Sequence, residues 1–225
     1  LIVWRQDVGW RKGSTDDVAV WRNQLQKNWS NLRSGVCYGG SGFIGHKSYT
    51  AQAAPRSNWM PEERQTRFHE EYLQNDSLFW GTWINNMFDY GSARRPYGIN
   101  GEGLVTIDRR ERKDAYYLYR ALWNERKPTL HIVDKRRSLR DRNRQAFSVY
   151  SSVGAPTLFV GADTVAMTQY AACQYRSDSV EIQGIVKVKA VAGEQCDSVT
   201  LRVGNVLKPK RQPVPRRTAG PQQTN

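Results

Sequence analysis

The chain has 225 residues, of which 39% are hydrophobic and 24% are charged, and it carries eight Trp and eleven Tyr. This length is enough for one large or two small domains with a buried core, and the aromatic content excludes a largely disordered chain. The net charge of +13 is compatible with binding to a nucleic acid or to an anionic surface. No segment reaches the roughly 18 consecutive apolar residues of a membrane helix, so no membrane partner is expected.

Three cysteines, Cys37, Cys173 and Cys196, show no metal-ligand spacing, and neither a metal nor another cofactor is predicted. At most one pair could form a disulfide, which leaves the redox compartment undecided, with a periplasmic or secreted location open for the parent protein. The chain opens on an apolar run, residues 1–4, with no start methionine and no charged leader. We interpret this run as an interior strand and expect the true N-terminus to lie upstream.

The first half of the chain alternates predicted strands with predicted helices. Strands are expected at residues 1–4, 35–38 and 78–88 from their apolar or aromatic content. Helices are expected to begin near residues 15, 62 and 113, where apolar positions recur on one helical face. This order predicts parallel strands joined by crossover helices, the arrangement in which an α/β barrel carries its chemistry at the carboxyl ends of the strands.

After Pro128 the pattern changes to short strands separated by turn residues. These strands are expected at residues 130–133, 146–150, 157–160, 185–191 and 198–203. Ile185, Lys187 and Lys189 alternate with apolar neighbours, as in a half-buried strand. The pattern predicts an antiparallel β-sandwich of roughly eighty residues, a size consistent with an immunoglobulin-like module.

Lysine and arginine are concentrated at residues 135–144 and again after residue 207. We interpret the first run as a solvated hairpin and the second as a disordered basic tail, since neither carries a nucleic-acid-binding motif. A nucleic-acid partner is therefore disfavoured.

Three consecutive segments resemble glycoside hydrolase family 2, the β-galactosidase family. Residues 79–90, FWGTWINNMFDY, resemble its final barrel strand, residues 98–109 the loop that follows, and residues 113–124 the last barrel helix. The fold class that this resemblance implies is α/β plus all-β: the C-terminal part of a (β/α)8 barrel at 1–127, an immunoglobulin-like β-sandwich at 128–207, and a disordered basic tail at 208–225.

The resemblance implies a retaining exo-glycosidase acting on β-galactosides, so the expected partners are a carbohydrate and the missing N-terminal half of the parent chain. Unpaired sheet edges in an isolated half barrel also predict poor solubility or association, including a homo-oligomer.

Retaining hydrolysis requires two carboxyl groups about 5 Å apart. In the family the acid/base Glu follows an Asn on an earlier strand, which the resemblance places upstream of Leu1. The nucleophilic Glu aligns with Cys37, within the run VCYGG. A cysteine is only a few per cent thiolate at neutral pH and lacks the second carboxylate oxygen. We therefore predict that Cys37 does not support normal turnover and favour a buried, inert thiol.

Four further positions are predicted to contact substrate: Asp7, His46, Trp83 and Asn85. Asp7 and Asn85 stand where the family carries a Tyr and a sugar-facing Trp, whereas His46 keeps its place after the second strand. Trp83 could stack on a sugar, although a core position is the favoured alternative. The proposed functions are a fragment or degenerate member of a retaining glycosidase, a non-catalytic carbohydrate-binding or assembly module, and a basic nucleic-acid binder.

Two further side chains are predicted to have structural roles. His69, on the helix expected at residues 62–73, is predicted to be a surface or interhelix residue. Asp89 follows the predicted strand at residues 78–88, and its carboxylate is expected to bind the backbone of the next loop.

Overall fold

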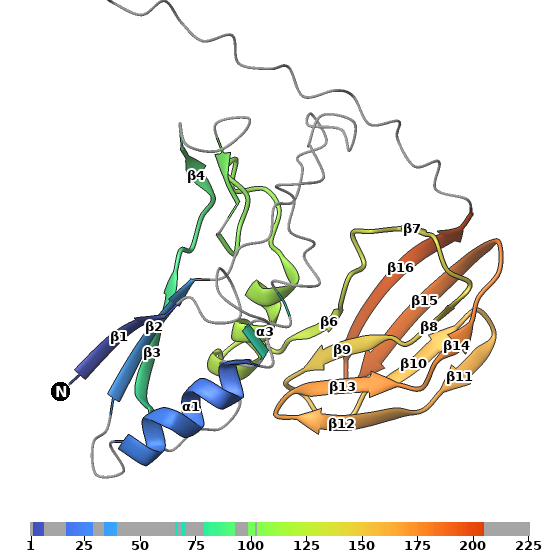
Figure 1. Ribbon diagram of the computed structural model, residues 1–225. Helices are drawn as coiled ribbons and strands as arrows, with labels where there is room; N and C mark the ends of the chain where they lie inside the picture. The colour runs from blue at the N-terminus through green and yellow to red at the C-terminus, as the bar shows by residue number, and fades with distance from the viewer. Residues whose placement is uncertain are drawn as a thin grey trace, which may run out of the picture.

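The computed structural model describes residues 2–6, 17–28, 34–39, 66, 69–70, 79–92, 99–101 and 103–204. This described part is mostly β, with few helices. Figure 1 shows a small sheet with helices on one side and a larger group of strands, within residues 130–203, on the other.

The N-terminal strands form a parallel sheet. Its strands are β1 (Ile2–Gln6), β2 (Ser34–Gly39) and β3 (Phe79–Asn85), in the order β1-β2-β3. The helix α1 (Asp17–Asn28) lies between β1 and β2 in the chain, as a parallel crossover requires. The three strands predicted here are confirmed, with small shifts in their ends.

The segment between β3 and the next helix contains two short strands, β4 (Tyr90–Gly91) and β5 (Ile99–Asn100), which pair antiparallel. It was predicted as a loop, and two-residue strands leave little pattern in a sequence. The helix α3 (Asp114–Trp123) follows and buries Ala115, Leu118 and Tyr119, as its apolar periodicity predicted.

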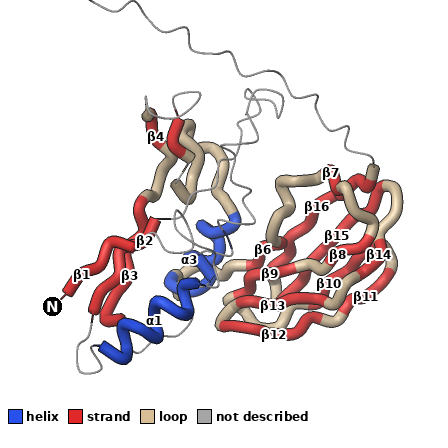
Figure 2. Tube along the Cα trace, in the orientation of Figure 1, coloured by secondary structure: helices blue, strands red, loops and turns tan. Residues whose placement is uncertain are grey.

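Two larger sheets make up the second half of the chain (Figure 2). The five-stranded sheet has the order β11-β10-β15-β16-β7, and the four-stranded sheet has the order β12-β13-β9-β6. The bounds of the first are β7 (Leu139–Arg140), β10 (Thr157–Val160), β11 (Asp163–Val165), β15 (Ile185–Ala192) and β16 (Gln195–Val203). The bounds of the second are β6 (Leu130–Ile132), β9 (Ser148–Ser151), β12 (Met167–Ala171) and β13 (Gln174–Ser177).

Neighbouring strands in both sheets are antiparallel, except that β16 and β7 run parallel. A separate pair joins β8 (Arg144–Gln145) to β14 (Val180–Glu181). The five strands predicted in this half are observed. Those not predicted are β7, β8 and β11 to β14, which are short and mostly polar.

The helix α3 and the two larger sheets form three layers. The two sheets share a core of nine buried side chains: Ile132, Phe147, Val149, Leu158, Val160, Ile182, Val188, Ala190 and Leu201. On β9, Val149 enters this core, whereas Tyr150 packs with Leu118 and Ala121 of α3. The alternation of side chains along a strand therefore places α3 on one face of the four-stranded sheet and the five-stranded sheet on the other.

The prediction of a solvated hairpin at residues 135–144 is only partly right: Arg137, Arg142 and Arg144 are exposed, but β7 and β8 pair with β16 and β14 and not with each other. Arg140 is only 3% exposed, and its guanidinium donates to the Asp134 carboxylate at 2.5 Å and to the Asp134 carbonyl at 2.9 Å. Lys135 forms an ion pair with Asp197 at 2.7 Å, and Arg136 lies 3.5 Å from Glu111. Two of these acids, Glu111 and Asp197, lie far from residues 135–144 in the sequence. The basic run by itself therefore gives no indication of them.

The immunoglobulin-like character of the sandwich stays a prediction, as do the boundaries at residues 127 and 207.

Candidate functional site

The register of the parallel sheet defines the position of Cys37. In the central strand β2, Cys37 is the Cα partner of Arg5 on β1 and of Trp83 on β3. Two residues later, Gly39 ends β2 opposite Asn85, the last residue of β3. Because the strands are parallel, their carboxyl ends lie at one edge, where barrel enzymes place catalytic groups.

Three of the predicted site residues, Cys37, Trp83 and Asn85, thus occupy neighbouring register positions at this edge. The structure places them through their backbone only. Asp7 and His46 lie outside the described residues. Their roles as nucleophile position and substrate contacts stay predictions.

The chain leaves β3 through a turn held by backbone hydrogen bonds. The Val105 N–H donates to the Met87 carbonyl at 3.0 Å, and the Asp89 N–H donates to the Val105 carbonyl at 2.9 Å. Leu104 and Val105 are both buried. The segment after residue 103 therefore returns alongside the end of β3 and fixes it.

A buried ion pair lies directly behind this turn. The Lys113 ammonium donates to Asp89 Oδ1 at 2.7 Å and to the Gly101 carbonyl at 2.9 Å. Asp89 Oδ1 also accepts from the Gly103 N–H at 2.8 Å. Burial raises the pKa of Asp89 above its usual value, and the neighbouring Lys113 opposes that shift. The predicted role of Asp89, binding the loop backbone, is confirmed.

Lys113 is the residue that precedes α3, so the same ion pair ties the end of β3 to the start of that helix. The Lys113 side chain is 0% exposed. An ion pair removed from water needs several hydrogen bonds to offset its desolvation, and the Gly101 and Gly103 backbone groups supply them. The arrangement is suited to positioning the sheet edge and not to transferring protons.

Three further hydrogen bonds connect helical residues 69 and 70 to the rest of the described chain. His69 is fully buried, and its Nδ1 lies 2.8 Å from the Tyr119 hydroxyl on α3. The expectation of an interhelix position is confirmed. The neighbouring Glu70 carboxylate accepts from the hydroxyls of Tyr150 at 2.8 Å and Tyr170 at 3.0 Å. The helical segment is thereby fixed to both α3 and the four-stranded sheet.

A second buried pair joins α3 to β6. His131 Nε2 lies 2.7 Å from Asp114 Oδ1, and Asp114 Oδ2 accepts from the Asp134 N–H at 2.8 Å. Burial raises the pKa of Asp114 to about 7. Burial, reinforced by Lys135, lowers the pKa of His131 to about 3. The contact is therefore a hydrogen bond of a neutral imidazole and not a pair of opposite charges.

Sequence reasoning missed the buried roles of Lys113, Asp114 and His131. Lys113 and Asp114 stand at the start of a helix, where charged residues are ordinarily solvated. Their burial depends on partners that are distant in the sequence, Asp89 and His131.

Within the described ranges, no group of three or more His, Cys, Asp or Glu side chains is arranged to hold a metal ion. No helix among the described residues has the length and apolar character needed to cross a membrane. Of the cysteines, Cys173 and Cys196 are free thiols in this part of the chain.

Comparison with known proteins relates the chain to sugar-cleaving enzymes. No family model matches it. A beta-glucuronidase of Bacteroides fragilis is 35% identical over 168 residues, which cover 71% of this chain and 24% of that protein. The crystal structure of an FMN-binding beta-glucuronidase from Faecalibacterium prausnitzii L2-6 aligns with a TM-score of 0.76 and 29% identity, over 90% of this chain and 32% of that one.

A Bacteroides fragilis protein assigned as a beta-galactosidase has the same fold, with a TM-score of 0.79 and 24% identity, over 90% of this chain and 32% of that chain. The chain is thus a homologue of glycosidases. More narrowly, it is homologous to beta-glucuronidases, which agrees with the resemblance of its sequence to glycoside hydrolase family 2. It spans about a quarter of the length of the curated relative.

Substitution of Gly103 by Ala is expected to destabilise the fold. A Cβ there would lie 2.1 Å from the Asp89 nitrogen and 2.2 Å from the Phe88 carbonyl carbon, so backbone must move. We expect a loss of about 2 to 3 kcal/mol in the free energy of unfolding, measured by urea denaturation. Gly204→Ala is the matched control, because nothing lies within 4 Å of its Cβ position. Equal stabilities of the two variants would contradict the close approach at Gly103.

The stability of the fold is expected to fall in acid through His69. Burial, with a smaller contribution from Lys113, lowers the pKa of His69 to about 3 in the folded chain, against about 6.5 when unfolded. Between these values the unfolded chain binds more protons, so stability is complete above pH ~6.5 and declines toward pH ~3. The expected slope is about 1.4 kcal/mol per pH unit.

The control is His69→Gln, in which this part of the slope should vanish. Asp114 and His131 do not obscure it, because together they bind one proton in both states between pH ~4 and ~6.5. Stability curves of wild type and variant that stay parallel from pH 4 to 6 would show that His69 is not buried as described.

Proposed function

We propose that the chain is a fragment or degenerate member of a retaining glycoside hydrolase, whose intact parent hydrolyses O-glycosidic bonds. The observation that carries this proposal is the 35% identity over 168 residues to the Bacteroides fragilis beta-glucuronidase. Since that relative and the Faecalibacterium prausnitzii structure are both beta-glucuronidases, we extend the proposed substrates from β-galactosides to β-glucuronides.

In the proposed architecture, residues 1–127 are the C-terminal part of a (β/α)8 barrel and residues 128–207 an immunoglobulin-like β-sandwich, with a basic tail at 208–225. The parallel order β1-β2-β3, with α1 between the first two strands, supports the barrel portion. A barrel has to close its sheet, so the remaining strands would come from the parent chain. Two sheets around one core support the sandwich.

The proposed chemistry needs one carboxylate to attack the anomeric carbon and a second carboxyl group to protonate the departing oxygen. Cys37 would stand at the first of these positions, near the end of the central strand. The acid/base Glu would come from the missing N-terminal half. Asp7, His46, Trp83 and Asn85 are the proposed substrate contacts around them.

Cys37 is the reason for treating the chain as degenerate. A thiol is one carbon shorter than the Glu side chain, and its single sulfur cannot share charge between two oxygens in an oxocarbenium-like transition state. Only a small thiolate fraction is present at neutral pH unless the surroundings lower the pKa. The proposal is therefore that this protein descends from a working glycosidase and has lost most of its turnover.

Replacing Cys37 by Glu in the intact gene product is expected to raise hydrolysis of aryl β-glucuronides or β-galactosides. We expect a gain on the order of a hundredfold or more in kcat, the lower range of what one positioned catalytic group contributes. The measurement is release of the coloured phenol. Cys37→Gln is the matched control: it has nearly the size of Glu but no nucleophilic carboxylate, so it should show no gain.

The alternative is a non-catalytic carbohydrate-binding or assembly module, which the changes at Cys37, Asn85 and Asp7 together favour. It predicts that Cys37→Glu stays inactive while glucuronic acid or galactose still alters the tryptophan fluorescence of the wild type. Absence of both activity and sugar binding would refute both proposals. A nucleic-acid binder is less well supported, because Lys135, Arg136 and Arg140 are paired with carboxylates of the same chain.

A further inference from the structure

The five-stranded sheet has one buried face and one exposed face. Along β15, Val188 and Ala190 are buried in the core, while Lys187 and Lys189, which alternate with them, are exposed. Along β16, Leu201 is buried and its neighbours on the strand are exposed. Since α3 packs against the four-stranded sheet, the outward face of the five-stranded sheet is the side of the molecule remote from α3.

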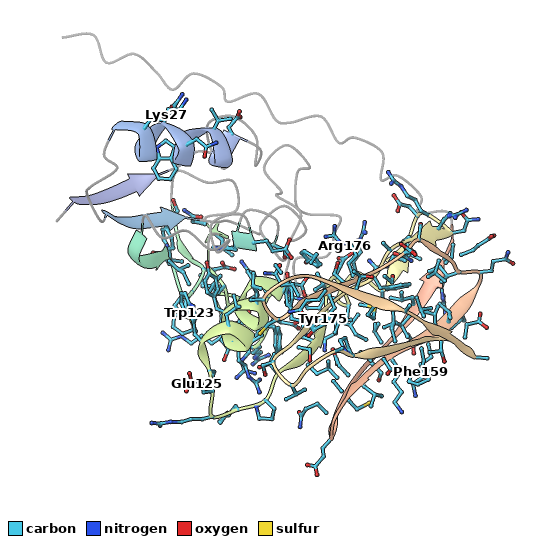
Figure 3. The ribbon with its side chains drawn as sticks, turned by 90° about the horizontal axis from the view of Figure 1, so that it is seen from below. Lys27, Trp123, Glu125, Phe159, Tyr175 and Arg176 are labelled. Carbon is cyan, nitrogen blue, oxygen red and sulfur yellow. The ribbon has the colours of Figure 1, made fainter. Side chains whose placement is uncertain are left out.

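Figure 3 shows this separation: Phe159, on β10 of the five-stranded sheet, lies at the opposite side of the β-rich part from Trp123, the last residue of α3.

The charges on this outward face have one sign. Lys187, Lys189 and Arg202 occupy outward positions and are exposed, and no ion pair holds any of them in the described part of the chain. The two acids on the strands of this sheet, Asp163 on β11 and Asp197 on β16, point the other way: Asp163 is the register partner of buried Val160, and Asp197 is the partner of buried Ala190.

The three cations form a row. Lys189 pairs with Ser198 and Lys187 pairs with Thr200, while Arg202 pairs with Ile185, two residues before Lys187. The charges therefore follow one another at two-residue steps, which is about 7 Å per step along a strand. The register partners add hydroxyl groups beside the lysines. A row of cations at a regular interval is complementary to a linear chain that repeats its negative charges.

A second copy of this chain is a poor occupant of the same face. A two-fold dimer through it would bring the row of cations against its own counterpart, and like charges placed together oppose association. Single-stranded nucleic acid is also poorly matched, because it depends on several aromatic platforms for base stacking. The strands β10, β11, β15 and β16 offer one aromatic side chain at an outward position. This is Phe159 on β10, the register partner of Lys189.

We propose that the outward face of the five-stranded sheet, through Lys187, Lys189 and Arg202, binds an acidic polysaccharide whose carboxylates repeat along the chain. This inference rests on the proposed function, which makes a glycan the expected polyanion. It assigns a docking surface for the polymer that is separate from the edge of the parallel sheet carrying Cys37. Exposed charge pairs are individually weak and screened by salt, so the binding is weak and depends on ionic strength.

The test uses the intact gene product, and the probe is sodium polygalacturonate. Fully methyl-esterified polygalacturonate serves as the uncharged polymer. The triple variant Lys187→Gln/Lys189→Gln/Arg202→Gln is compared with Arg126→Gln/Lys127→Gln/Arg142→Gln, which removes the same charge from exposed positions elsewhere. Binding is measured by biolayer interferometry at low and at physiological ionic strength. Thermal melting checks that both variants fold.

We expect wild type and the second triple variant to bind within about threefold of each other, and the first to bind at least about tenfold more weakly. The esterified polymer should not bind, and salt should weaken the wild-type interaction. Equal losses in both variants, equal binding of the esterified polymer, tighter binding of oligo(dT), or no wild-type binding would each overturn the proposal. Polymer binding is measured without any turnover. An inactive Cys37→Glu variant would therefore reject the glycosidase proposal, whereas the binding of polygalacturonate would still decide the proposal for the five-stranded sheet.

Discussion

The ion pair between Asp89 and Lys113 is the contact on which the arrangement of the first half depends. It joins the turn after β3 to the residue before α3, and it is removed from water. Breaking one partner of such a pair is costly because the remaining charge stays buried, so the two elements are held in one relative position. Gly103 makes this possible, since its N–H completes the shell around Asp89 and its missing side chain lets the chain approach β3.

A second set of polar contacts connects that half to the sheets. Asp114 and His131 link α3 to β6, and the Glu70 carboxylate holds hydroxyls from β9 and β12. Hydrogen bonds require closer alignment than apolar packing does, so these contacts define how α3 lies on the four-stranded sheet. The apolar contacts of Leu118 and Ala121 with Tyr150 supply area at the same junction, whereas the polar groups determine its geometry.

Local patterns predicted the strands β2 and β3, the helix α3 and the alternation of β15, because each depends on spacing within a short stretch. Asp89 was also predicted to bind the following loop, since a carboxylate after a strand has backbone N–H groups within reach. The partners of Lys113 and Arg140 were not predicted, because which charges meet depends on the folded chain. The strand β12 was not predicted because its sequence, MTQYA, is largely exposed and lacks apolar alternation. At the candidate site, the position of Cys37 followed from resemblance, and its register neighbours required the structure.

The contacts that hold the end of β3 in place involve Asp89, Gly101, Gly103 and Lys113, and none of these is a position proposed to carry chemistry. The residues that stabilise this region are therefore separate from those proposed to act on substrate. Selection on folding acts on the first group whether or not a substrate is ever cleaved, and it leaves the second free to drift once turnover no longer matters. A lineage of such proteins can lose its nucleophile in a single substitution while its scaffold persists, available for binding roles that ask only for a rigid sheet.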